Sequence, residues 1–116
     1  MTRRVLFLAV ISALALAVPT LAAGRPFQGT DGPGATITLK RANGTKLRHT
    51  RPGFHRFAIH DLSGFHNFHL YGPGVGRRTG IAFMGDRMWR VTLQVGTYRF
   101  RCDAHPKTMR GSFTVS

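Results

Sequence analysis

The sequence predicts an all-β domain, a Greek-key β-sandwich, and three observations support this prediction. Apolar and polar residues alternate with period two over segments 36–40, 89–95 and 97–102, as they do in half-buried strands. No segment shows a sustained helical period. Turn signals recur between the apolar segments with the spacing of a sandwich, at Asn43-Gly44, Pro52-Gly53, Gly72-Pro73-Gly74, Gly85-Asp86 and Val95-Gly96. We therefore expect eight strands or nearly eight.

Residues 1–23 have the pattern of a cleaved secretory signal peptide. Arg3 and Arg4 form a positive start, residues 5–18 an apolar run, and Ala22 or Ala23 a small-residue cleavage position. The apolar run of 14 residues is shorter than the ~20 that span a bilayer, although a retained anchor stays as the alternative. The paired arginines also resemble a twin-arginine signal, so the export route stays open. We expect residues 24–116 to form the mature domain, in an extracytoplasmic location that is periplasmic or secreted.

Length and charge limit the classes of function. A chain of 116 residues has room for one domain and none for a second, cofactor-binding unit. Its 17 Lys and Arg against 4 acidic residues give a formal charge of +13. Such an excess favours acidic partners. The arginines alternate along the strands without a run longer than two, so a solvated basic face is favoured over a polyanion-binding or nucleic-acid-binding module.

Cys102 is the single cysteine, so it forms no internal disulfide. Cys102 follows Tyr98 and Phe100 at intervals of two residues, so it points inward with them. By itself this position is typical of a small buried hydrophobic residue. The loop that follows favours another interpretation. Cys102, His105 and Met109 place a thiolate, an imidazole and a thioether close together in the chain, and these are donors suited to copper.

A second imidazole is expected from His66. In segment 65–70, His66 shares a face with Phe68 and Leu70, whereas His69 shares the opposite face with Asn67. His66 therefore points toward the core. The other histidines are expected at the surface, namely His49, His55, His60 and His69.

These residues resemble the cupredoxins, the type 1 blue copper proteins, and most closely the plastocyanin and amicyanin group. The resemblance covers nearly the whole mature chain. It is carried by the pair His66-Asn67 and by the loop from Cys102 through His105 to Met109, with the flanking segments GTYRFRC and MRGSFTV. Three residues separate His105 from Met109, one more than in amicyanin and one fewer than in plastocyanin, so this spacing departs from both.

The resemblance implies one type 1 copper ion bound by His66, Cys102, His105 and Met109, with Asn67 hydrogen-bonding across the site to hold the Cys102 loop. It also implies that His105 is the more exposed imidazole, within an apolar patch to which Pro73, Gly74 and Pro106 contribute. Met84 and Met88 are expected to pack in the core or at its rim rather than to form a second copper site, and Trp89 to lie in the core.

An enzyme is not expected, because four ligands leave no open position for a substrate. Arg101 and Asp103 flank Cys102, where a multicopper oxidase has histidines, and the single cysteine excludes a binuclear copper centre. The resemblance implies a monomeric electron carrier that docks transiently with an acidic redox protein of the cytochrome or oxidase type. Peripheral membrane association is compatible with this role. A copper carrier or sink in copper homeostasis is the alternative.

Overall fold

The structure is a computed structural model that describes residues 2, 9 and 24–116. The predicted signal peptide, residues 1–23, lies outside the described residues except for positions 2 and 9. Within residues 24–116 the chain forms nine β-strands: β1 (Phe27–Asp31), β2 (Ile37–Lys40), β3 (His49–Thr50), β4 (Gly53–Asp61), β5 (His69–Gly72), β6 (Val75–Arg78), β7 (Gly85–Leu93), β8 (Gly96–Arg101) and β9 (Arg110–Val115). In this part of the chain, no helix has the length and apolar character needed to cross a membrane.

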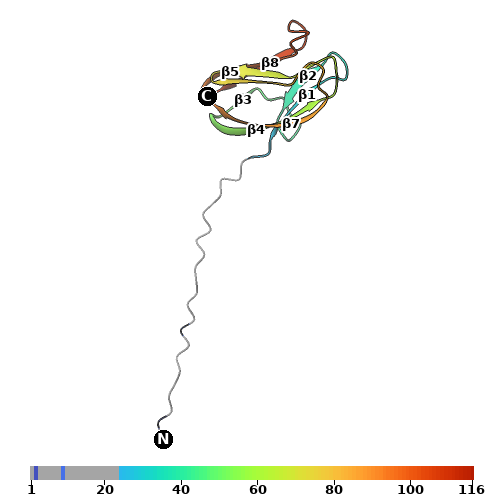
Figure 1. The fold of residues 1–116 in the computed structure, drawn as a ribbon. Helices are drawn as coiled ribbons and strands as arrows, with labels where there is room; N and C mark the ends of the chain where they lie inside the picture. The colour runs from blue at the N-terminus through green and yellow to red at the C-terminus, as the bar shows by residue number, and fades with distance from the viewer. Residues whose placement is uncertain (1, 3–8, 10–23) are drawn as a thin grey trace.

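The strands form two sheets that pack face to face, as Figure 1 shows. One sheet has the order β2-β1-β4-β7 and the other the order β3-β9-β8-β5-β6. Most neighbours are antiparallel, but β1 pairs with β4 in parallel and β3 pairs with β9 in parallel. The chain passes from one sheet to the other five times, after β2, β3, β4, β6 and β7. The all-β sandwich predicted from the sequence is confirmed.

Aromatic side chains from both sheets fill the core. The ring of Phe68 stacks on Phe100 with centroids 5.5 Å apart, and it contacts Trp89 edge-on at 6.3 Å. Tyr98 stacks on Phe113 at 5.5 Å. A Cβ atom at position 111 would collide with the ring of Phe100, so only glycine fits on β9 beside this ring. This packing fixes β8, whose last residue precedes Cys102.

The sequence and the structure differ at two places. Gly85-Asp86 was expected as a turn, but β7 already begins at Gly85, whose φ of 144° is accessible to glycine. Residues 66–68 were expected to open a strand, whereas β5 begins at His69 and His66 lies in the preceding loop. Asn67 was therefore placed wrongly on the outward face: its side chain is 1% exposed, because loop geometry rather than strand alternation directs it.

Two aspartates form a buried pair inside the sandwich. Asp31 and Asp61 lie opposite each other at the ends of parallel strands β1 and β4, and both are 0% exposed. The backbone N–H of Ser63 donates to Asp61, but both oxygens of Asp31 lack a partner within the described part of the chain. Burial, together with the adjacent Asp61 carboxyl, raises the pKa of Asp31 from 3.8 to about 7. At neutral pH and below, a proton on Asp31 is needed to satisfy the pair.

This pair makes a pH dependence of stability testable with Asp31→Asn. Between pH 3.8 and about 7, Asp31 holds a proton in the folded protein and has lost it in the unfolded chain. The free energy of unfolding therefore decreases as the pH rises through this window, by roughly 4 kcal/mol at most for a shift of about three pKa units. Chemical denaturation at pH 4, 5, 6 and 7 should show this decrease in the wild type and a smaller one in Asp31→Asn.

Asp86→Asn is the control for the loss of one carboxylate at an exposed position, where the side chain is 78% exposed, and it also changes the contact with His60. The histidine contacts are the same in the wild type and in Asp31→Asn, because no histidine bonds to Asp31 within residues 24–116, so the difference between these two profiles isolates the pair. Parallel pH profiles for the wild type and Asp31→Asn would contradict the raised pKa of Asp31.

Candidate metal centre

Two loops at one end of the sandwich carry the predicted ligands, and we call this the metal end. The loop of residues 62–68 joins β4 to β5 and presents His66. The loop of residues 102–109 joins β8 to β9 and closes on itself. The N–H of Cys102 donates to the carbonyl of Met109 at 2.9 Å, and the N–H of Met109 donates to the carbonyl of His105 at 2.9 Å. The three residues between His105 and Met109 thus fit one turn.

Three donor atoms form a triangle within this end. Cys102 Sγ lies 3.8 Å from His66 Nδ1 and 3.8 Å from His105 Nδ1, and the two Nδ1 atoms are 3.2 Å apart. Ligands that surround one ion at about 2.0 Å for nitrogen and 2.3 Å for sulfur, as for zinc, lie at comparable mutual distances. The spacing and the donor types fit a type 1 copper site.

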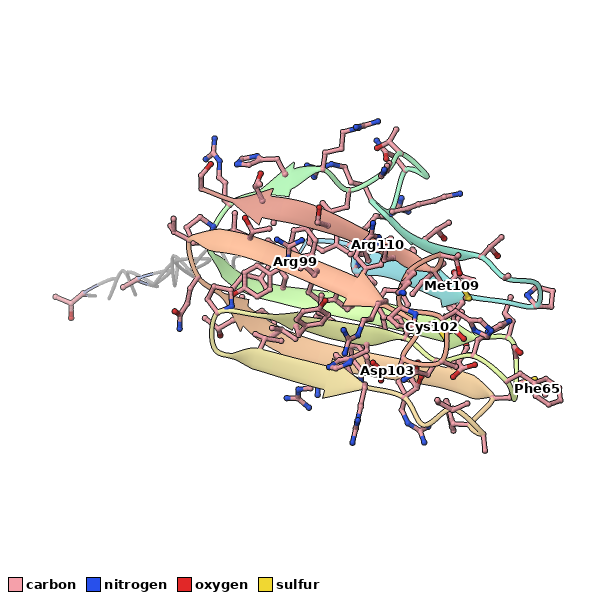
Figure 2. The ribbon with its side chains drawn as sticks, turned by 90° about the horizontal axis from the view of Figure 1, so that it is seen from above. Phe65, Arg99, Cys102, Asp103, Met109 and Arg110 are labelled. Atoms are coloured by element: carbon pink, nitrogen blue, oxygen red, sulfur yellow. The ribbon has the colours of Figure 1, made fainter. Side chains whose placement is uncertain are left out.

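The ligand candidates differ in exposure. Cys102 is 0% exposed, Met109 1% and His66 8%, whereas His105 is exposed. Figure 2 shows Cys102 and Met109 at the same end of the molecule. The expectation that His105 is the more exposed imidazole agrees with this geometry. Solvent therefore reaches the cluster from the side of His105.

Asn67 connects three segments at the metal end. Its side-chain oxygen accepts the N–H of Asp103 at 2.7 Å, and its amide group donates to the Thr79 carbonyl at 3.0 Å and to Asp103 Oδ2 at 2.9 Å. Its backbone N–H points at Cys102 Sγ, 3.5 Å away. The expected bond from Asn67 across to the Cys102 loop is therefore present, and it extends to the segment after β6.

Asp103 is a connecting residue that the sequence analysis did not single out. Besides Asn67, its carboxylate accepts hydrogen bonds from His69 Nδ1 at 2.8 Å and from Arg101 Nε at 3.0 Å. Burial alone would raise the pKa of Asp103, but the hydrogen bonds from His69, Asn67 and Arg101 outweigh it and lower the pKa to about 2. The carboxylate is therefore charged at every ordinary pH, and it fixes the start of the ligand loop.

The remaining histidines lie outside the donor triangle. His49 contacts Ser116, His55 contacts the Arg51 carbonyl, and His60 lies between Asp86 and Gln28. His69 was expected at the surface without a partner, but its side chain bonds to the carboxylate of Asp103. The opposite charges of Arg101 and Asp103, on either side of Cys102, were the signal in the sequence for the ion pair between Arg101 and Asp103.

Two expectations about the surface need correction. Pro73 and Gly74 form the turn between β5 and β6 beside Gly96, at the opposite end from Cys102, so they are not part of a patch around His105. Met84 and Met88 are 65% and 49% exposed and lie outside the core, whereas Trp89 is 8% exposed and lies within it as expected.

The apolar surface near the donors comes from the 62–68 loop instead. Phe65, next to His66, is 81% exposed, and Figure 2 shows it at the tip of the metal end. The alternation of apolar and polar residues shows which side chains of a strand point inward, but it gives no information on side chains in a loop. The exposure of Phe65 was therefore not predicted from the sequence.

The two sheets and the donor triangle at their end define a protein with the cupredoxin fold. Solved structures of rusticyanin are similar to it. Reduced rusticyanin gives a TM-score of 0.58 at 15% identity over 81% of this chain and 80% of that one. A rusticyanin described as a copper protein gives a TM-score of 0.56 at 14% sequence identity, over 81% of this chain and 78% of that one. Rusticyanin from Thiobacillus ferrooxidans gives a TM-score of 0.55 at 17% sequence identity, over 81% of this chain and 78% of that one. No protein family model and no curated protein sequence matches the chain.

The role of Asn67 is testable by Asn67→Ala. The substitution leaves the N–H of Asp103 and the Thr79 carbonyl without their partner in a largely buried place. We expect the free energy of unfolding to decrease by about 2–4 kcal/mol. Guanidinium denaturation of the metal-free protein measures this. Asn43→Ala, in an exposed turn, is the control and should cost less than about 1 kcal/mol. Equal losses in both variants would show that Asn67 does not hold the loops.

Proposed function

We propose that the chain is an extracytoplasmic, mononuclear type 1 copper protein that transfers single electrons between redox partners. The observation that carries this proposal is the triangle of His66 Nδ1, His105 Nδ1 and Cys102 Sγ at the end of a cupredoxin fold. The similarity to rusticyanin, described as a copper protein, supports copper as the metal. The predicted leader supports an extracytoplasmic location.

The donor set suits copper better than a harder ion. Two imidazoles and one thiolate are borderline and soft donors, and Met109 supplies a buried thioether from the same loop. Copper held by His66, Cys102, His105 and Met109 would supply a one-electron Cu(I)/Cu(II) couple. The chain holds Cys102 away from water, and the backbone N–H of Asn67 points at its sulfur, so this donor atom is shielded and held in place.

The loop frame limits movement of the donors. Asn67 and Asp103 hold His66 and Cys102 from both sides, and the hydrogen bonds within loop 102–109 hold His105 and Met109. Donor atoms that are already together need little rearrangement when the charge of a bound ion changes. Because the buried ligands leave only His105 at the surface, the site favours electron exchange over the binding of a substrate.

The surface of the metal end supports the proposal that an acidic redox protein docks there. His105 and Phe65 are exposed there, and Lys107 lies in the ligand loop. Arg78 pairs with His69 across β5 and β6, and the side chain of His69 contacts Asp103 in the ligand loop. Arg77 and Arg78, the last residues of β6, therefore add positive charge near the metal end. An apolar centre with a basic rim fits a transient complex with an acidic partner.

Cys102→Ser tests the metal assignment. A hydroxyl is a hard, weakly acidic donor that does not replace a thiolate. We expect the protein loaded with Cu(II) to lose its intense visible thiolate-to-copper band and its reversible reduction, while circular dichroism shows a folded sandwich. Thr108→Ser, in the same loop, is the control and should keep the band. An intense blue band in Cys102→Ser would refute the assignment.

Met109→Gln tests the axial position. An amide oxygen is a harder donor that favours Cu(II), so copper should stay bound while the reduction potential falls. Redox titration measures the shift, and Met88→Gln, at an exposed methionine, is the control. A potential equal to that of the wild type would show that Met109 is not an axial ligand.

Salt and charge reversal test the docking surface and separate an electron carrier from a copper carrier or sink. Stopped-flow electron exchange with an acidic cytochrome should be rapid and slow with added salt, as the screening length shortens to ~8 Å near physiological strength. Arg77→Glu/Arg78→Glu should slow association severalfold without changing the visible spectrum.

The control Arg48→Glu/Arg51→Glu reverses the same charge near β3, which pairs with the far end of β9. Association rates that change neither with salt nor in Arg77→Glu/Arg78→Glu would exclude the basic rim as a docking surface. Absence of rapid exchange with any redox protein, together with an intact copper spectrum, would favour the carrier or sink.

A further inference from the structure

A groove on the outer face of the second sheet brings three arginines together. It has a volume of about 450 Å³ and is lined by Tyr71, Arg99, Arg101, Pro106, Arg110 and Ser112, and we call it the arginine groove. It lies over β5, β8 and β9. Figure 2 shows Arg99 and Arg110 on these strands, set back from Cys102.

The strand register explains why the arginines converge. Arg101 lies directly opposite Arg110 in the antiparallel pair of β8 and β9, and Arg99 is two residues before Arg101 on the same face. Like charges that face each other across a strand pair destabilise a sheet. A local cost of this kind in an otherwise consistent fold is typical of a functional site.

The charges in the groove are only partly neutralised. Arg101 Nε donates to Asp103 Oδ1 at 3.0 Å, and its guanidinium lies over the ring of Tyr71. For Arg99 and Arg110, no carboxylate lies within ion-pair distance among residues 24–116.

The acidic residues of the chain are already used elsewhere. The sequence has four acidic residues. Asp31 and Asp61 are buried in the sandwich, Asp86 contacts His60, and Asp103 is the partner of Arg101. The arginine groove therefore holds two guanidinium charges that no side-chain carboxylate of the described chain balances.

We infer that the arginine groove binds a tetrahedral oxyanion with two negative charges, of the phosphate or sulfate type. Two unbalanced guanidinium charges match a dianion. The planar N–H forks of Arg99 and Arg110, the free end of Arg101 and the Ser112 hydroxyl offer more donors than the two oxygens of one carboxylate accept. The four oxygens of a phosphate or sulfate suit donors that approach from two strands.

Titration of the full-length protein with sodium phosphate, sodium sulfate and sodium glutarate tests this inference. Calorimetry is carried out with and without added copper, in a chloride buffer at constant ionic strength. Phosphate and sulfate should bind one to one and saturably, and more tightly than glutarate. Because the groove contains none of the proposed copper ligands, binding should also occur without copper, which keeps this result independent of the proposed function.

Arg99→Gln/Arg110→Gln should weaken phosphate binding by at least about tenfold, because two charge-assisted contacts are lost. Arg48→Gln/Arg51→Gln removes the same net charge at the other end and should change the affinity by less than about twofold. If the double variant does not fold, ¹H–¹⁵N spectra of the wild type test the site instead. The Nε–H signals of Arg99, Arg101 and Arg110 should then shift when phosphate is added.

Three results would overturn the inference. Equal losses in both double variants would show attraction by net charge alone, and an absence of saturable binding or of shifts at these arginines would show that no site exists. Glutarate binding as tightly as phosphate would show that the arginine groove recognises a carboxylate, such as an acidic side chain of a partner protein.

Discussion

The side-chain amide of Asn67 is the interaction on which the metal end depends. It joins the loop that carries His66, the loop that carries Cys102 and the segment that follows β6 through three hydrogen bonds. Each of these segments leaves a different strand, and bonds between Phe68 and Thr79 and between His69 and Asp103 support the same arrangement. Because a buried amide has to satisfy its donors and its acceptor, the three loops are held in one arrangement. The donor triangle is a consequence of this arrangement.

The sandwich could be predicted from the sequence because each strand has one buried face. Alternation places Trp89, Val91 and Leu93 inward on β7 and Tyr98 and Phe100 inward on β8, and the structure agrees. The same principle does not apply to loops. Asn67 is buried although alternation directs it outward, because its partners come from segments distant in sequence. Gly85 resembles a turn residue locally, but pairing with Asp61 keeps it in a strand.

The cluster of His66, Cys102 and His105 could be predicted because the chain has a single cysteine, His105 follows it after two residues, and His66 shares a face with core residues. Their surroundings could not be predicted in the same way. Asp103 is one of four acidic residues, and its contacts with His69 and Asn67 join positions 34 and 36 residues apart in the sequence. The arginine groove depends on the register that sets Arg101 opposite Arg110, which a sequence pattern does not provide. Pro73 was assigned to the wrong end because its distance from Cys102 depends on the direction in which β5 runs.

The closure of loop 102–109 makes it a separable part of the molecule. Its two ends leave β8 and β9 as direct neighbours, and the bond from the N–H of Cys102 to the Met109 carbonyl seals its base. Changes in the number of residues between His105 and Met109 are therefore absorbed above this base, without any shift of the sheets below. A scaffold built in this way tolerates insertions and deletions in its ligand loop, so evolution can retune the metal environment by exchanging one short peptide.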